Sequence, residues 1–429
     1  MAKRIDVGGA RRLFIPDNLP CPTVMAGGIG SVNTSQYCLE PSDIKMTTTD
    51  KPAYAVPSMA AIRELPWNGF NAISTFSGCG GSSLGYRMAG FRVLWASEFI
   101  DAARDSYRAN KADYTILDGR DIREVTAAEI LTAIKMQPGE LDLFDGSPPC
   151  ASFSTAGKRE AGWGKIKKYS DKSQRTDDLF FEYTRLLQGL QPKVFVAENV
   201  SGLVKGTAKG YFLEILRALK ACGYRVSCRV LDAQWLGVPQ SRQRTIFIGV
   251  REDLGLDPVH PKPLPYRYSV REALPWIDSA MRDDRGAFGN GGPITDKPAP
   301  TVLADSVGTH WVESETDISR YAIGREWERM GKPGTQSDKY FQLVRPDTEK
   351  PCPTITQRGG DNTVASVTHP TEKRKFTIAE LRRICAFPDD FILTGTYAQQ
   401  WERLGRAVPP VMMSHIAATI RDDILAKVR

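Results

Sequence analysis

Two side chains in the sequence combine chemical reactivity with a position at the end of an apolar run. Cys150 closes the segment Asp145-Gly-Ser-Pro-Pro-Cys150, which directly follows the run at 141–144. Glu198 follows a second apolar run at 194–197. A cysteine thiolate is a nucleophile, and a carboxyl group at a buried strand end is either an ion-pair partner or a tuned acid. A lone cysteine is more often a small buried side chain, so from the residues alone both interpretations of Cys150 stay open.

A glycine-rich segment offers a place for a cofactor. Phe76-Ser-Gly-Cys-Gly-Gly-Ser-Ser-Leu-Gly85 lies between the β-rich run 72–76 and a helix-like stretch. Glycines let a ligand approach the backbone, and a helix N-terminus presents free N–H groups. Glu98 ends the next predicted strand, 92–97, where an acidic side chain can accept hydrogen bonds from a ribose diol. The segment lacks a strict G-x-G-x-x-G pattern, so it favours a nucleoside cofactor over NAD specifically.

The elements that must position these residues alternate between strands and helices over residues 71–250. A further strand is expected at 244–250, preceded by Gln240-Ser-Arg-Gln-Arg244 with its two arginines. Amphipathic helices are expected at 178–187 and 212–219. This alternation predicts an α/β fold with a mostly parallel sheet covered on both faces, and such sheets bind ligands at the C-terminal ends of their strands.

The rest of the chain differs from residues 71–250 in composition and in predicted secondary structure. Residues 255–375 are rich in Pro, Gly, Asp and Thr and predict a smaller, loop-rich domain, whereas 376–429 return to helix, at 378–386 and 411–428. A pattern x-P-x-P-T-[VI] recurs at 19–24, 297–302 and 350–355. It is either a recurring extended turn or a duplicated unit, and the second interpretation suggests that residues 1–70 pack with the loop-rich domain.

Composition excludes several classes of protein. The 429 residues are 41% hydrophobic and 25% charged, and no stretch is long and apolar enough to cross a membrane. The eight cysteines form no C-x-x-C pair and there are four histidines, which argues against a metal cage and favours the reducing cytoplasm. The formal charge is +7, and a local excess of Lys and Arg occupies 158–175. Charge alone does not separate a solvated loop from a nucleic-acid contact there.

Five motifs occur in a characteristic order along the sequence. They are Phe76-Ser-Gly-Cys-Gly-Gly, Ser147-Pro-Pro-Cys150, Glu198-Asn-Val200, Gln240-Ser-Arg-Gln-Arg244 and Gly405-Arg-Ala-Val-Pro409. With these motifs the sequence resembles the DNA (cytosine-5) methyltransferases of bacterial and phage type across residues 71–429. The resemblance implies a Rossmann-like methyltransferase domain at 71–254, a target recognition domain at 255–375, and C-terminal helices at 376–429 that complete the first domain.

The resemblance implies a mechanism on double-stranded DNA. Cys150 would add to carbon 6 of a flipped-out cytosine, and Glu198 would protonate ring N3. Arg242 would contact the O2 side of the base and Arg244 would support the loop. S-adenosyl-L-methionine would supply the methyl group. The base that removes the C5 proton is not identified. Residues 151–175 would close over the DNA, which gives the basic run a phosphate-binding role. We expect a cytoplasmic monomer without membrane attachment.

The same resemblance implies a cofactor site. Phe76, Gly78, Gly80 and Leu84 would line the methionine and ribose portion, while Glu98 would hold the ribose hydroxyls. Phe99 would lie against adenine, and Asp121 with Ile122 would meet its amino group. The remaining implied positions are Pro148, Arg406 and Val408.

Two positions depart from the family pattern. Ala151 stands where glutamine is frequent, and Arg406 stands where asparagine is usual, near the methionine end of the cofactor. Arg406 either turns to solvent or a backbone carbonyl, or binds a carboxylate on the transferred group. In the second case carboxy-S-adenosyl-L-methionine would give 5-carboxymethylcytosine. Two further alternatives are an RNA cytosine-5 methyltransferase and a non-catalytic DNA-binding homologue. The missing Cys-Phe-Thr signature and the intact catalytic set argue against them.

Overall fold

A computed structural model describes residues 51–149, 179–204, 209–277 and 316–428. Outside these ranges it describes only the strands β1 (Lys3–Ile5), β2 (Leu13–Ile15), β3 (Val24–Met25), β8 (Lys167–Tyr169) and β9 (Lys172–Gln174). Cys150, Ala151 and most of the basic run therefore lie outside the described residues.

The predicted α/β fold with a mostly parallel sheet is confirmed. One sheet has the strand order β3-β11-β12-β10-β7-β4-β5-β6. The strands from β10 to β6 run parallel, whereas β12 is antiparallel to both β10 and β11. Its main strands are β4 (Asn71–Thr75), β5 (Arg92–Ser97), β6 (Ile116–Asp118), β7 (Leu143–Gly146), β10 (Val194–Val200), β11 (Tyr224–Asp232) and β12 (Gln243–Arg251).

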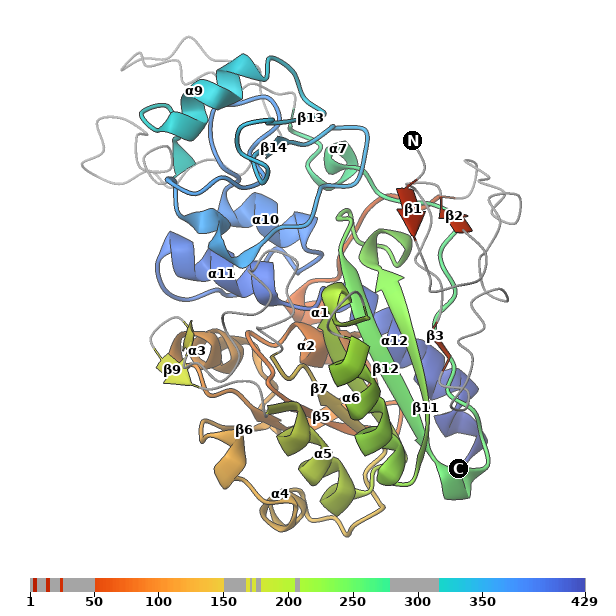
Figure 1. The fold of residues 1–429 in the computed structure, drawn as a ribbon. Helices are drawn as coiled ribbons and strands as arrows, with labels where there is room; N and C mark the ends of the chain where they lie inside the picture. The colour runs from red at the N-terminus through yellow and green to blue at the C-terminus, as the bar shows by residue number, and fades with distance from the viewer. Residues whose placement is uncertain are drawn as a thin grey trace, which may run out of the picture.

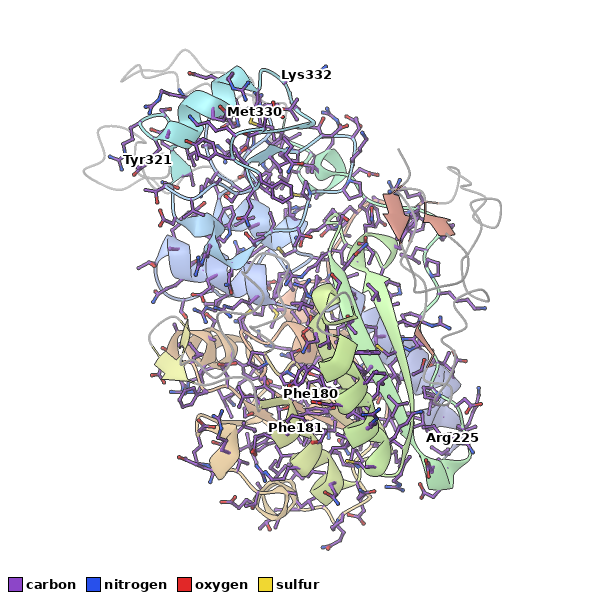
Figure 2. The ribbon with its side chains drawn as sticks, in the orientation of Figure 1. Phe180, Phe181, Arg225, Tyr321, Met330 and Lys332 are labelled. Carbon is purple, nitrogen blue, oxygen red and sulfur yellow. The ribbon has the colours of Figure 1, made fainter. Side chains whose placement is uncertain are left out.

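Helices cover both faces of this sheet (Figure 1). One face packs against α4 (Ala127–Ile134), α5 (Leu179–Leu190) and α6 (Lys209–Ala221). Figure 2 shows Phe180 and Phe181 on α5; Phe180 is buried with its ring 6.0 Å from that of Phe247 in β12, whereas Phe181 is 41% exposed. The other face packs against α2 (Gly81–Met88) and α12 (Pro410–Asp423). The C-terminal helix α12 thus packs against the sheet that the earlier part of the chain forms.

A second lobe lies above the sheet in Figure 1. It contains α9 (Ala322–Arg329) and the short strands β13 (Thr335–Gln336) and β14 (Val344–Arg345), with Tyr321, Met330 and Lys332 around α9 (Figure 2). Its small core consists of Ile318, Ile323, Trp327 and Leu343. Between this lobe and the sheet lie α10 (Ile378–Ile384) and α11 (Tyr397–Arg406).

Several boundaries differ from expectation. The strand expected at 141–144 is β7, two residues later, and the helix expected at 411–428 ends at Asp423, followed by a 3₁₀ turn at Leu425–Lys427. A helix α1 (Met59–Glu64), capped by the Ser58 side chain, interrupts the expected irregular N-terminal segment. It is tied to the C-terminal part because the Met59 backbone N–H donates to Asp390 at 2.8 Å.

Candidate active site

A cavity of about 880 Å³ opens at the C-terminal edge of the parallel strands. Its walls come from the turns that follow β4, β5, β6, β7 and β10, from the start of β12, and from the segment 402–408. The side facing the second lobe is formed by residues 341–342 and 354–357. The structure brings most of the predicted site residues to this one cavity: Phe76, Gly78, Glu98, Phe99, Asp121, Ile122, Pro148, Glu198, Arg242, Arg244, Arg406 and Val408.

Glu198 and Arg244 form an ion pair at one end of the cavity. The register of β10 and β12 places Glu198 opposite Ile246 and Val200 opposite Arg244. Since side chains two apart on a strand share a face, Arg244 lies diagonally beside Glu198. Arg244 Nε donates to Glu198 Oε1 at 2.8 Å, and both side chains are nearly buried. This arrangement orients the carboxylate toward the cavity and compensates its buried charge.

Arg242 has different surroundings. Its guanidinium is buried and donates from Nη1 to the Ile355 carbonyl at 3.1 Å and from Nη2 to the Gly405 carbonyl at 2.9 Å. Burial lowers its pKa to about 9. The two bonds connect the start of β12 with the second-lobe side of the cavity and with the C-terminal end of α11. Arg242 therefore holds three segments of the cavity wall together.

The motif that carries Cys150 is attached to the Glu198 motif. Asn199 Nδ2 donates to the Pro148 carbonyl at 3.1 Å. The parallel register of β7 and β10 places Gly146 beside Ala197, so Ser147 and the two prolines follow at the same sheet edge as Glu198. Cys150 itself lies outside the described residues, but the chain leading to it is fixed as far as Pro149.

Asp145, at the start of this motif, is buried below the cavity. Its carboxyl group accepts from Ser74 Oγ at 2.7 Å and from the Tyr86 hydroxyl at 3.0 Å. Burial raises the pKa of Asp145 to about 7, and the nearby Glu198 charge acts in the same direction. Asp145 does not line the cavity, so it supports the strand end rather than the reacting groups.

The other end of the cavity suits a nucleoside with vicinal hydroxyls. Glu98 is buried, and its carboxylate accepts from the Gly78 N–H at 2.7 Å and from the Ile100 N–H at 2.8 Å. Burial raises its pKa, while these backbone bonds and the nearby Arg403 and Arg406 oppose that shift. The carboxylate is held in place by backbone and borders open space, as a diol-binding acceptor requires.

The turn between β4 and α2 is shaped by unusual backbone. Phe76, Gly78 and Gly80 have φ values of 53°, 57° and 99°. A Cβ on Gly81 would lie 2.2 Å from the Val408 carbonyl oxygen, so the C-terminal segment presses directly on the helix start. The structure does not bring Gly80 or Leu84 to the cavity wall: Gly80 faces the Tyr107 ring, and Leu84 is buried in the core beneath.

Three predicted adenine-site residues line the cavity beyond Glu98. Asp121 caps the 3₁₀ turn Ile122–Glu124 by accepting from the Arg123 N–H at 3.0 Å, and it also pairs with the Arg123 guanidinium. Phe99 follows Glu98, and its carbonyl accepts from Arg104 Nη1 at 3.3 Å. Since these residues follow β5 and β6, they extend the site along the same edge.

Arg406 is the last residue of α11 and pairs within its own helix. Its Nε donates to Glu402 Oε1 at 2.8 Å, and both residues line the cavity. The pairing differs from either orientation expected for Arg406, toward solvent or a backbone carbonyl, or toward a bound carboxylate. An i,i+4 pair of this kind partly neutralises the cation inside the wall.

Sequence reasoning missed other parts of the wall. Thr354, Ile355, Thr356 and Gln357 line it, and the first two belong to the third copy of the proline-containing repeat. This copy is docked on the arginine motif, since the Ser241 N–H donates to the Cys352 carbonyl at 2.8 Å and Thr354 Oγ1 donates to the Ser241 carbonyl at 2.6 Å. The proline-containing repeat was the sequence feature that could have indicated this part of the wall. No sequence feature indicated Glu402, because the helix α11 was not predicted.

Comparisons with known proteins identify the family. The family model for C-5 cytosine-specific DNA methylase matches residues 70–422. The type II methyltransferase M.NgoPII of Neisseria gonorrhoeae is 29% identical over 363 residues, covering 83% of this chain and 97% of that protein. M.NgoFVII of the same organism is 30% identical over 352 residues, covering 81% and 85%.

Solved structures share the fold. A protein described as a DNA modification methyltransferase encoded within an E. coli prophage has a TM-score of 0.58 at 24% identity, covering 83% of this chain and all of that one. A Spodoptera frugiperda DNMT2 variant has a TM-score of 0.53 at 18% identity, covering 84% and 99%.

The fold and the matched family model together define an S-adenosylmethionine-dependent methyltransferase. The chain belongs to the C-5 cytosine-specific DNA methylase family and is a DNA cytosine-5 methyltransferase. In the part of the chain that the structure describes, no cluster of acidic, histidine and cysteine side chains could hold a metal ion. No helix of that part has the length and apolarity to span a membrane.

Proposed function

We propose that this enzyme methylates C5 of a cytosine flipped out of double-stranded DNA, with Cys150 as nucleophile and S-adenosyl-L-methionine as methyl donor. One observation carries the proposal. A single cavity contains both the buried Glu98 carboxylate beside the glycine turn and the Glu198–Arg244 pair beside the chain leading to Cys150. A cofactor and a base bound at these two ends would meet inside it.

The proposed chemistry starts at the Glu198 end. The Cys150 thiolate adds to C6 of cytosine while Glu198 gives a proton to N3, so the ring becomes an enamine that is nucleophilic at C5. After C5 has gained the methyl group, a base takes the C5 proton, the S–C6 bond breaks to give back the Cys150 thiolate, and N3 returns its proton to Glu198. Extrusion of the base is needed because C6 is inaccessible in the stacked duplex.

For Arg242 and Arg244 we propose roles that are the reverse of those implied by the family resemblance. Arg244 lies beside Glu198 in the cavity, so we assign to Arg244 the contact with the cytosine O2 side. Arg242 already donates from both terminal nitrogens to backbone carbonyls, so we assign it the supporting role. Charge that develops on the ring is stabilised by a cation fixed in advance, which costs no reorganisation during the reaction.

The residues at the Glu98 end fit the methyl donor. Glu98 offers a fixed acceptor for ribose hydroxyls, and the turn before α2 offers N–H groups and backbone without side chains at Gly78. Phe99, Asp121, Ile122, Pro148 and Val408 would complete the enclosure. When bound, the cofactor supplies an electrophilic methyl group; the protein supplies orientation and exclusion of water.

Transfer of a carboxymethyl group is the second candidate that concerns this site. Arg406 lines the cavity as a permanent cation, but Glu402 already pairs with it at 2.8 Å, which favours the ordinary methyl donor. Mass spectrometry of nucleosides after reaction with S-adenosylmethionine or its carboxy derivative decides between them. We expect 5-methylcytosine alone, unchanged in Arg406→Asn. A 5-carboxymethylcytosine product that disappears in Arg406→Asn would establish the second candidate.

Covalent trapping tests the proposed mechanism. A duplex containing 5-fluorocytosine cannot release the C5 substituent, so incubation with the enzyme and S-adenosylmethionine should yield a covalent protein–DNA complex. Cys150→Ala is the matched variant and should yield none. A complex formed only on RNA, or no complex on any duplex that contains the methylated site, would overturn the proposal in favour of an RNA enzyme or a non-catalytic homologue.

The biological setting is a further part of the proposal. The relatives with the highest similarity described above are type II methyltransferases, so we propose a role in restriction–modification. Bisulfite sequencing of DNA from cells that express the protein would give the methylated site. A single short sequence methylated at nearly all copies is expected, and scattered methylation without a sequence preference would contradict this role.

A further inference from the structure

Phe341 stands out among the described side chains by its exposure. It is 82% exposed, while the next most exposed large apolar side chain, Ile392, is 52% exposed. Leaving a phenyl ring in water forgoes the free energy of burying it. Isolated exposed apolar side chains are common on protein surfaces, so exposure alone assigns no role to Phe341.

The turn that carries Phe341 is firmly built. It joins β13 and β14 in the second lobe (Figure 1), and Ser337 Oγ accepts from the N–H groups of Lys339 and Tyr340 at 3.1 and 2.9 Å. The Phe341 carbonyl accepts from Gln336 Nε2 at 2.5 Å, and the neighbouring Leu343 is wholly buried. The backbone of Phe341 is therefore fixed on both sides, and its ring is directed outward by an ordered turn.

The location of the turn connects it to the site. Phe341 and Gln342 line the same cavity as Glu198 and Arg244, but from the second lobe. Lys339 in the same turn adds a cation on this side. Because Phe341 lines this cavity and is also 82% exposed, its aromatic ring lies where the cavity opens to solvent on the side of the second lobe.

We propose that Phe341 inserts into the DNA at the position vacated by the flipped cytosine and stacks on the adjacent bases. The inference rests on the proposed function and extends it to a named DNA-contacting residue. Removing a base from the stack leaves its neighbours without a partner surface, and a planar apolar side chain restores that contact. The ring thereby lowers the cost of the flipped state without reading a particular sequence.

The test compares Phe341→Ala, Phe341→Trp and the control Ile392→Ala on two sets of duplexes. One set carries a normal pair at the target, and the other a mismatch there, which lowers the cost of extrusion in advance. Because base–aromatic stacking contributes on the order of 10- to 100-fold in affinity, Phe341→Ala should lose about that factor on the normal duplex and much less on the mismatched one. Phe341→Trp and Ile392→Ala should bind both duplexes like the parent protein.

A second readout follows extrusion directly. With 2-aminopurine at the target position, the parent enzyme should give the fluorescence rise of an unstacked base, and Phe341→Ala a smaller one. An equal loss of affinity on both duplexes with an unchanged fluorescence rise would overturn the inference and place Phe341 on the flanking DNA. No loss at all would also overturn it. Trapping of the parent enzyme on 5-fluorocytosine DNA tests the proposed function separately, and thermal melting checks the fold of each variant.

Discussion

The Glu198 carboxylate works under two opposing demands. It accepts from Arg244 Nε at 2.8 Å, and it must give a proton to N3 in the proposed reaction. Arg244 holds the carboxyl group in place, so that the proton can pass to N3 as the ring accepts the thiolate. At the scale of single residues, the reaction therefore depends on a proton rather than on the shape of this side chain.

Glu198→Gln separates the proton from the shape. Glutamine keeps an oxygen that can accept from Arg244, but it has no proton to give to N3. We expect the single-turnover rate of methyl transfer to fall by about 10²- to 10⁴-fold while DNA still binds. Glu182→Gln, on the outer side of α5 and paired with Arg185, is the control and should leave the rate unchanged. A Glu198→Gln rate close to that of the control would contradict the assignment.

Asp145 gives a prediction about pH. Its pKa in the fold is about 7 because the carboxyl group is buried, whereas in the unfolded chain it is about 3.9. Between these values the folded protein holds a proton that the unfolded chain releases, so this group makes stability fall as pH rises from about 4 to 7. Asp145→Asn removes that dependence.

Urea unfolding at a series of pH values measures this effect. The stability of Asp145→Asn relative to the parent should rise by on the order of a few kcal/mol between pH 4 and pH 7. The asparagine loses one of the bonds from Ser74 and Tyr86, but that loss is the same at every pH. Parallel pH curves for the two proteins would show that Asp145 is charged in the fold.

At the scale of elements, the end of the cavity beside Glu98 depends on contact between distant parts of the chain. The start of α2 presses against Val408, and further along the helix a Cβ on Gly85 would lie 2.5 Å from Met413 Cβ in α12. The two helices approach so closely because glycines face the contact. The glycines of the motif at 76–85 thus serve helix packing as well as ligand approach.

Gly81→Ala tests this close approach. The added methyl group would meet the Val408 carbonyl at 2.2 Å, so the helix start or the C-terminal segment must move. We expect a loss of about 1–3 kcal/mol in unfolding free energy and weaker binding of S-adenosylmethionine by calorimetry. Gly210→Ala in the first turn of α6 has no atom within 4 Å of the new Cβ and should be neutral or slightly stabilising. Equal behaviour of the two variants would contradict the argument.

Local sequence patterns predicted these elements unequally. The strands near 72–76, 92–97 and 244–250 were predicted because their apolar runs are short and bounded by polar or glycine residues. The strand β11 was not, since its sequence Tyr-Arg-Val-Ser-Cys-Arg-Val-Leu-Asp mixes polar and apolar residues as an antiparallel strand does. Helix α11 was also missed, although Tyr397, Trp401 and Leu404 have helical spacing and are buried.

The site residues that lie at strand ends were predictable from the sequence. The site residues that come from the second lobe were not. Glu98, Glu198 and Arg244 each follow or begin a strand, so topology alone gathers them at one edge. Phe341 and Thr354 reach the same cavity through contacts far apart in sequence, which no local pattern encodes. Which of Arg242 and Arg244 lies beside Glu198 was similarly beyond reach, because only the register of β12 against β10 decides it.

At the scale of the whole molecule, the net charge of +7 is unevenly distributed along the chain. Residues 158–175 hold Lys158, Arg159, Lys165, Lys167, Lys168, Lys172 and Arg175 against Glu160 and Asp171. This segment lies in the chain between Cys150, the proposed nucleophile, and α5. We therefore expect the electrostatic part of DNA binding to depend on this segment more than on the second lobe.

The salt dependence of DNA affinity tests this expectation. Each phosphate contact contributes about 0.9 to the slope of log affinity against log salt concentration. The double variant Lys167→Gln, Lys168→Gln should reduce the slope by roughly one to two. The control, Lys135→Gln with Lys220→Gln, removes the same charge at the C-terminal ends of α4 and α6, which lie at the opposite edge of the sheet. If both double variants change the slope equally, only the net charge of the protein matters for DNA binding, and the expectation for residues 158–175 is wrong.

The contact of Val408 and α12 with the start of α2 also concerns the timing of synthesis. A ribosome makes the glycine turn, Glu98, Glu198 and Arg244 long before it makes the segment 402–423 that closes the wall beside them. Until that segment has emerged, the nascent chain has Cys150 but only part of the cavity wall beside Glu98. We therefore expect a nascent chain that stops before residue 402 to bind S-adenosylmethionine weakly and to leave DNA unmodified.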